Sequence, residues 1–129
     1  MKNEAMRDDI YLLDANAILR YLLKDVEEQF EVVNDIIHHH YCVVSLEVLA
    51  EVTYVLNGLY QVPRSIIAIV YRKLAGEVVI QNADVLLRAL EIFDQPPKLD
   101  FVDCLMYGYK VARGYNVVTF DQKLSKVLL

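Results

Sequence analysis

Short apolar runs of strand length alternate with longer amphipathic stretches along the chain. The short runs lie at residues 10–13, 41–44, 78–80 and 116–119. In the stretches between them, apolar residues recur every three or four positions, the spacing of one face of a helix. Helices are therefore expected at residues 17–23, 26–40, 46–56, 64–75, 84–93, 101–113 and 122–128. Strands that alternate with helices are typical of an α/β sandwich with a mainly parallel central sheet.

Residues that favour helix ends mark several of these boundaries. Ser45 follows the second apolar run and is of a type preferred as an N-cap. The pair Pro96 and Pro97 prevents a helix from continuing into the residues that follow. Gly114 is suited to the left-handed position that often follows the last turn of a helix. The predicted elements therefore have local start and stop signals as well as a hydrophobic pattern.

The length and composition predict one globular domain over residues 1–129. A chain of 129 residues has the usual size of a single compact domain, and a hydrophobic content of 56% excludes disorder. Every apolar run is interrupted by charge well before the roughly 20 residues that a membrane span needs. The charged stretch at residues 1–9 lacks the apolar core of a secretory leader. We therefore expect a cytoplasmic protein with no membrane association.

Charge and cysteine content narrow the classes of function. The formal net charge of −5 argues against binding nucleic acid through broad phosphate neutralisation, so any RNA contact must be local. The same acidic balance suits a protein that gathers carboxylates around a cation. Cys42 and Cys104 form no CxxC motif and lie in apolar contexts, so we expect two buried thiols and no disulfide.

Two acids follow predicted strands directly. Asp14 comes after the first apolar run and Asp121 after the last. In an open parallel sheet, ligands bind at the carboxyl ends of the strands, so both positions are candidates for a binding site. Each acid also fits the N-cap of the helix that follows it, and for Asp14 its position alone does not separate the two interpretations. Asn16 is a second residue of capping type at the first of these helices.

Three further acids lie near helix starts or on a helix. Asp100 fits an N-cap after the prolines, and Asp103 then occupies the third helical position, where acids are also common because of the helix dipole. Glu51 lies on the mostly apolar helix after the second strand, where an inward carboxylate needs a partner or a metal and an outward one is simply solvated. Glu47, one turn earlier, competes with Glu51 for the same role.

These acids predict a site only if their side chains lie close together at one edge of the sheet. Several carboxylates meeting at one edge of a sheet repel each other unless a cation or a shared proton holds them. Sites with oxygen ligands alone select hard cations such as Mg²⁺, which binds a few carboxylates, several waters and a substrate phosphate. A metal at such a site lowers the pKa of a bound water and neutralises charge on a phosphodiester. The pattern therefore favours a metal-dependent nuclease.

Four motifs in this order resemble the PIN domain family, and especially the VapC-type toxins. They are LLDANAIL, SLEVLAEV, DFVDCL and VVTFDQKL, and together they extend over nearly the whole chain. Each motif alone is short and weak. The resemblance rests on the complete set at this length.

The resemblance implies a three-layer α/β/α fold with a sheet of four or five strands. It also implies endoribonuclease activity with Mg²⁺, or Mn²⁺, held by Asp14, Glu51, Asp103 and Asp121, with cleavage by a metal-activated water. Asn16 and Thr119 match supporting polar positions, and Asp100, which is not part of the family's core pattern, is a further candidate for a supporting role. Toxins of this type usually form homodimers and are silenced by an antitoxin bound in an apolar groove. The resemblance therefore predicts an RNA substrate, an antitoxin partner and a homodimer.

Several other features have two interpretations each. Arg20 and Lys24 either steer a phosphate toward the metal or form a solvated helix face, and the same holds for a basic strip at Lys110, Arg113, Lys123 and Lys126. Adjacent histidines on a helix cannot converge on one ion, so residues 38–40 are interpreted as a favourable helix end. An apolar groove or dimer face is predicted as an alternative to core packing for Tyr54, Leu59, Tyr60, Ile66, Ile67, Ile69 and Tyr71.

Three rival functions were compared with the nuclease. A phosphatase of the HAD type requires a DxDx[TS] motif, but Asn16 and Ile18 occupy the positions of its second acid and its hydroxyl residue. The spacing of Asp103 and Asp121 does not suit a phosphorylatable receiver domain. A catalytically inactive PIN-like binding module is the remaining alternative. The four acids are all present, and an inactive module has no physical reason to keep carboxylates that repel one another. Their presence therefore favours the enzyme over the inactive module.

Overall fold

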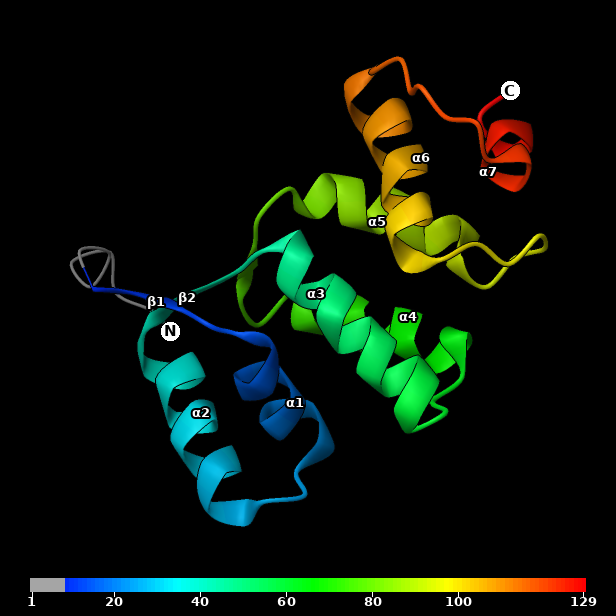
Figure 1. Ribbon diagram of the computed structural model, residues 1–129. Coiled ribbons are helices and arrows are strands. Elements are labelled where there is room, and N and C mark those ends of the chain that lie inside the picture. Colours follow the sequence, from blue (N-terminus) through cyan, green and yellow to red (C-terminus); the bar gives the residue numbers. More distant parts are fainter. Residues whose placement is uncertain (1–8) are drawn as a thin grey trace.

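A three-stranded parallel sheet and the helices that follow its strands form the computed structural model, which describes residues 9–129 (Figure 1). The elements are β1 (Ile10–Leu12), α1 (Ala15–Leu23), α2 (Glu27–His39), β2 (Tyr41–Val44), α3 (Leu46–Thr53), the π-helix η2 (Tyr54–Leu59), α4 (Arg64–Leu74), β3 (Val79–Ile80), α5 (Ala83–Phe93), α6 (Phe101–Arg113) and α7 (Gln122–Val127). The α/β class and the parallel sheet predicted from the sequence are confirmed.

The sheet has the order β1-β2-β3, with β2 in the centre. Ile10 is aligned with Tyr41 in the first parallel pair, and Val43 with Val79 in the second. A sheet of four or five strands is not found in residues 9–129, because residues 116–119 adopt no strand conformation there. Pairing of this run depends on a partner strand distant in sequence, which local hydrophobicity cannot supply. The outer edge of β1 therefore lacks a neighbouring strand within the described residues.

The helix boundaries follow the local signals closely. The Ser45 hydroxyl accepts a hydrogen bond from the Val48 N–H at 3.2 Å, and so satisfies one of the free amides at the start of α3. At the end of α6, Gly114 adopts φ 70°, a left-handed conformation that glycine reaches without steric cost. The peptide bond between Pro96 and Pro97 is cis. These residues fix where α3 begins and where α6 begins and ends.

One helix end differs from the prediction. The helix after the second strand was expected over residues 46–56, but the chain continues past Thr53 as η2 to Leu59. The Asn57 side chain donates from Nδ2 to the Val62 carbonyl at 3.0 Å, so it stabilises the turn that follows. The helical conformation therefore ends at Leu59, a few residues beyond the expected end of the helix.

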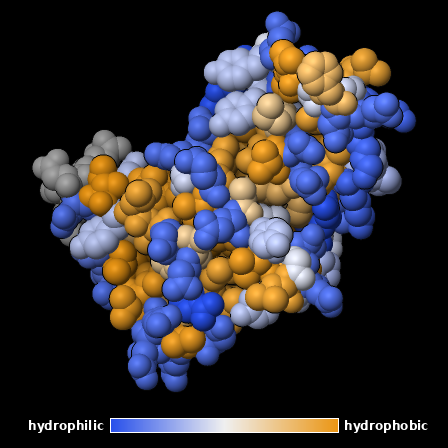
Figure 2. Space-filling view, in the orientation of Figure 1, coloured by the Kyte–Doolittle hydropathy of each residue, from blue (hydrophilic) through white to orange (hydrophobic). Residues whose placement is uncertain are grey.

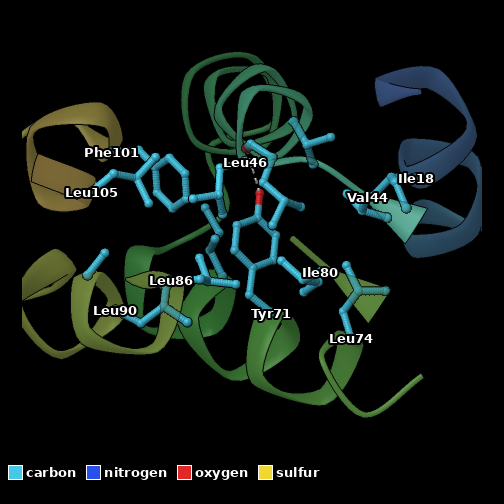
Figure 3. Close-up of a cluster of buried hydrophobic side chains, with 14 of the residues drawn as sticks. Ile18, Val44, Leu46, Tyr71, Leu74, Ile80, Leu86, Leu90, Phe101 and Leu105 are labelled. Carbon is cyan, nitrogen blue, oxygen red and sulfur yellow. Dashed lines mark hydrogen bonds between the residues drawn. The ribbon is translucent and has the colours of Figure 1, made fainter. Parts of the chain in front are cut away.

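The core extends from the sheet to α6 (Figure 3). Ile18 of α1 lies against Val44 of β2 at one end, and Phe101 and Leu105 of α6 lie at the other. Between them, the Tyr71 hydroxyl and the Thr53 Oγ1 are 2.7 Å apart, and Thr53 donates to the Leu49 carbonyl at 2.7 Å. These hydrogen bonds satisfy the polar atoms that the core encloses.

The start of α6 is held firmly against α4 and α5. Arg64 donates from Nη1 to the carbonyl oxygens of Phe93, at 2.9 Å, and of Leu99. The Phe101 ring meets Tyr71 and Phe93 edge-on, with centroids 6.0 and 5.7 Å apart. From this anchor, α6 and α7 extend to the opposite end of the molecule from β1 and α2 (Figure 1). The anchor therefore fixes the distance between the C-terminal elements and the sheet edge.

Two further expectations concern covalent state and membranes. Cys42 and Cys104 are both buried and form no disulfide within the described residues, as predicted. No helix in residues 9–129 is long and apolar enough to cross a membrane. The expectation that the chain lacks a leader rests on residues 1–9, of which residues 1–8 lie outside the described part.

Candidate functional site

Three acids line one open hollow where α6 and α7 begin. Asp103 lies in the first turn of α6, Asp121 is the N-cap of α7, and Asp100 is the residue before α6. The hollow has a volume of about 290 Å³ and is lined by Lys98, Leu99, Asp100, Asp103, Asp121, Gln122 and Lys123. Asp100 makes no side-chain capping bond, although the sequence suggested this role. Its carboxylate is therefore free to act with Asp103 and Asp121.

The electrostatics of this hollow favour a cation. Partial burial, followed by the charges of Asp121 and then Asp100, raises the pKa of the Asp103 carboxyl above its ordinary value. A raised pKa means that the negative form of Asp103 is disfavoured by its surroundings. A hard divalent cation removes this penalty, because it offsets the repulsion and accepts oxygen ligands. Carboxylate oxygens are donors that Mg²⁺ and Mn²⁺ prefer, although the three acids of this hollow do not themselves form a group that could hold a metal within residues 9–129.

Asp103→Asn is expected to raise the melting temperature of the metal-free protein at neutral pH. The raised pKa makes the folded state bind a proton more tightly than the unfolded chain does, so ionisation of Asp103 reduces stability as pH rises through the folded pKa. Asparagine removes this loss. The gain should shrink as the pH is lowered and disappear below the ordinary carboxyl pKa of 3.8, where Asp103 is protonated in both the folded and the unfolded state.

Thermal melting in EDTA at several pH values measures this effect. Glu47→Gln is the matched control, since Glu47 is an exposed acid in the first turn of α3 and reports loss of the helix-dipole interaction alone. A melting temperature for Asp103→Asn at or below that of the control, across the pH range, would contradict the account.

Asp121 has a structural role as well as its place in the hollow. Its Oδ1 accepts a hydrogen bond from the Leu124 N–H at 2.8 Å, which caps α7. The Asp121 N–H in turn donates to the Thr119 hydroxyl at 3.0 Å. Thr119 therefore helps to orient Asp121, and its supporting role at the predicted site stays a prediction.

Asp14 lies where the sequence placed it, at the carboxyl end of β1. The strand's hydrogen bonding ends one residue earlier, with the Leu13 N–H donating to the Val43 carbonyl at 3.0 Å. The Asp14 Oδ1 accepts from the Ala17 N–H at 2.8 Å, so Asp14 itself is the N-cap of α1. Asn16 is exposed in the first turn and does not cap the helix. The cap uses one oxygen of Asp14 and leaves the other for a ligand.

Glu51 and Glu47 are both exposed on α3. They are four residues apart, and Tyr54 follows three residues after Glu51, so the three lie along one stripe of the helix. Tyr54 lines a second hollow, of about 380 Å³, together with Asp100 and Phe101. Neither Glu47 nor Glu51 lines this hollow, so the choice between them as the helical acid stays open.

The four predicted acids do not meet in the described structure. Asp103 and Asp121 share a hollow, but Asp14 and Glu51 do not line it. Nowhere in residues 9–129 do three or more His, Cys, Asp or Glu side chains form a group that could hold a metal. The physical reason is the unpaired run at residues 116–119: as a strand beside β1, it would bring Asp121 to Asp14. The structure therefore does not bring the four predicted acids together, and their common site stays a prediction.

The predicted RNA contacts on α1 have other partners. Arg20 forms an ion pair with Asp25 at 3.1 Å, and the Lys24 ammonium lies 5.3 Å from the centre of the Phe30 ring. A helix rises about 1.5 Å per residue, so Lys24 is roughly 15 Å along α1 from Asp14. Both side chains therefore stabilise the turn between α1 and α2, and the solvated-face interpretation describes them better.

The remaining signals also have local explanations. The ring nitrogen Nδ1 of His38 is 2.7 Å from the Asn34 carbonyl, that of His39 is 2.9 Å from the Asp35 carbonyl, and the His40 ring packs on Tyr11. The residues therefore close α2, as interpreted from the sequence. In the basic strip, Arg113 is paired with Asp84 and with the Asn82 amide oxygen, so it joins α6 to α5.

Two residues of the hollow were underestimated or missed. Asp100 was set apart from the core acids, yet it lines the hollow with Asp103 and raises the pKa of that carboxyl. Lys98 was not singled out, although it lines the same hollow together with Lys123. The only sequence signal for Lys98 is its place between the prolines and Asp100. Lys98 lines the hollow because the folded chain brings it close to the start of α7, a contact between residues distant in sequence.

The PIN domain family matches residues 11–128, and the chain therefore belongs to this family. PIN domains are typically nucleases that act on RNA, and they usually bind divalent metals. Comparison with curated proteins and with solved structures gave no match.

Proposed function

We propose that the protein is a Mg²⁺-dependent endoribonuclease. Membership of the PIN domain family supports a nuclease. The observation that supports a metal site is that burial and the neighbouring charges of Asp121 and Asp100 raise the pKa of the Asp103 carboxyl. Carboxylates arranged so that they repel one another destabilise a fold and suit a cation. The shared hollow of Asp100, Asp103 and Asp121 supports this proposal.

The complete site requires Asp14 and Glu51 as well. All four side chains offer oxygen atoms, the donors that Mg²⁺ and Mn²⁺ prefer. When bound, the metal supplies an acidified water and neutralises charge on the phosphodiester. The chain's own residues position these donors: the caps of α1 and α7 fix Asp14 and Asp121, and Thr119 holds the backbone of Asp121.

Two lysines beside the hollow suit an RNA backbone. Lys98 and Lys123 line it together with the three acids. Ammonium groups attract phosphate, and on a protein with a net charge of −5 such attraction must be local. We therefore propose Lys98 and Lys123 as phosphate contacts in place of Arg20 and Lys24.

Cleavage of a labelled single-stranded RNA in Mg²⁺, Mn²⁺ or EDTA tests the proposed activity. We expect internal cuts in either metal that leave a 5′-phosphate and a 3′-hydroxyl, and no cuts in EDTA. Products with a 2′,3′-cyclic phosphate, or equal cleavage in EDTA, would contradict metal-dependent hydrolysis. Lys98→Gln should weaken RNA binding, whereas Lys73→Gln, an exposed lysine on α4, serves as its control.

A catalytically inactive PIN-like module that binds RNA or protein is the second candidate. The separation of Asp14 and Glu51 from the hollow at α6 is the observation that favours it. A Mg²⁺ titration separates the two candidates. The enzyme gains thermal stability with Mg²⁺ and loses this gain in Asp14→Asn, whereas the module shows no such shift.

We further propose that the protein is the toxin of a toxin–antitoxin pair, with an antitoxin as its partner, and that it forms a homodimer. Tyr54, Leu59, Tyr60, Ile66 and Ile69 are exposed, while Ile67 and Tyr71 belong to the core. Apolar side chains gather over η2 and the end of α3 in Figure 2, beside the hollow of about 380 Å³. An exposed apolar surface of this kind supports a partner-binding role.

A further inference from the structure

β1 has an edge that no described strand covers. One side of β1 pairs with β2, and its other side has no partner strand within residues 9–129. Ile10 and Leu12 are exposed to 57% and 73%. An edge strand with free N–H and carbonyl groups and apolar side chains is a template for another strand.

Residues 115–120 form the matching element. The run Val117-Val-Thr-Phe120 consists of β-branched and aromatic residues, which favour strands. Val118 is 86% and Phe120 98% exposed. Within the described chain, no main-chain group of residues 115–120 takes part in a hydrogen bond. A segment of this composition with an unpaired backbone gains hydrogen bonds and apolar burial when it joins a sheet edge.

The segment is held away from β1 of its own chain. The start of α6 is fixed to α4 and α5 by the two bonds of Arg64 and by the rings of Tyr71, Phe93 and Phe101. Figure 1 shows the segment, which joins α6 to α7, on the far side of α3 and α5 from β1. To reach its own sheet, it would have to break this buried anchor. The β1 edge of a second copy can be reached with the anchor intact.

We propose that two copies of the chain exchange these segments, so that residues 117–120 of each copy pair in parallel with β1 of the other. The exchange is reciprocal and closed, and it covers the β1 edge of each copy. Parallel strands end on the same edge of a sheet. Asp121, directly after the segment, thus comes beside Asp14 of the other copy.

Each active site is then shared between two chains. One copy supplies Asp14 and Glu51, and its partner supplies Asp103 and Asp121, which already share a hollow. The four carboxylates repel each other, so Mg²⁺ strengthens the dimer and EDTA weakens it. This composite site rests on the proposed function, whereas the strand exchange itself does not.

A pair of engineered cysteines tests the exchange without reference to activity. Neighbouring strands lie about 4.8 Å apart, within the range that a disulfide bridges. The double variant Ile10→Cys/Val117→Cys, oxidised in Mg²⁺ and run on a non-reducing gel, should form a covalent dimer. The native thiols do not compete: both are buried, and burial raises the pKa of Cys104 to about 12. Val32→Cys/Val117→Cys is the control, since Val32 is exposed on α2, and it should stay unlinked.

An internal disulfide in the monomer would show that the segment joins its own sheet, and it would overturn the exchange. Absence of any disulfide would overturn the pairing altogether. These outcomes hold whether or not the protein cleaves RNA, so failure of the exchange is distinct from failure of the proposed function.

Complementation tests the shared site. Asp14→Asn and Asp103→Asn, co-expressed with different tags, place both changes in one site of a mixed dimer and leave its other site intact. Random pairing makes half of the dimers mixed, so about one quarter of the wild-type cleavage rate should return. No recovery from the two inactive variants, when the wild type is active, would contradict the shared site.

Discussion

Asp14→Asn is expected to lower the rate of metal-dependent RNA cleavage at least about a hundredfold while leaving folding stability nearly unchanged. The Asp14 Oδ1 caps α1 through the Ala17 N–H, and asparagine caps helices as well as aspartate does. The amide lacks the negative charge that a metal ligand needs. Changes to the outer partners of metal ligands already cost about 10- to 100-fold, and a direct ligand should cost more.

Asp14→Ala separates the two roles of this residue. It should lose the same activity and, in addition, about 1 kcal/mol of stability, because the cap is also removed. Cleavage rates and urea denaturation of both variants measure the two effects. Asp35→Asn is the control, because Asp35 is an exposed acid of α2 whose carboxylate pairs only with His39 in the described structure. If Asp14→Asn retained wild-type cleavage, Asp14 would be a helix cap and nothing more.

Gly108→Ala is expected to lower the free energy of unfolding by about 2 kcal/mol, although it adds only one methyl group. A Cβ atom at Gly108 of α6 would overlap the Val85 carbonyl oxygen of α5 and lie 3.1 Å from the Val85 Cγ1. Overpacking of this kind costs about 1–3 kcal/mol, and a helix carbonyl cannot move aside as a flexible side chain can. Alanine favours helices over glycine by only about 1 kcal/mol, so the steric cost dominates.

Gly58→Ala is the matched control for Gly108→Ala. Gly58 lies in η2, and a Cβ there meets no atom within 4 Å. This variant should keep or slightly raise the free energy of unfolding measured by urea denaturation. Equal stability of the two alanine variants would show that α5 and α6 can separate without cost. The packing that anchors the C-terminal elements would then be weaker than the structure indicates.

Elements defined by local signals could be predicted well from the sequence. The first two apolar runs became β1 and β2, and Ser45 and Gly114 act at the helix ends where their side-chain chemistry placed them. These features depend on neighbours within a few residues. Asp14 and Asp121 were likewise placed correctly after their runs, and both proved to be helix caps in addition.

Features that depend on distant contacts could not be predicted in the same way. The run at residues 116–119 has the composition of a strand, but a strand also needs an edge, and here the anchor at Arg64 holds the run away from β1. For the same reason, the four acids do not converge. Asp103 and Asp121 line one hollow, but Asp14 and Glu51 do not line it. Lys98 and Asp100 entered the candidate site only because the chain turns back beside α7.

The rate of RNA cleavage against Mg²⁺ concentration, compared between the wild type and Asp103→Asn, tests the central claim most directly. The account predicts that wild-type cleavage rises with Mg²⁺ and saturates, while Asp103→Asn remains near the background rate although it is at least as stable as the wild type without metal. Equal cleavage by the two proteins, or cleavage that does not depend on Mg²⁺, would contradict a metal-dependent nuclease built on these acids.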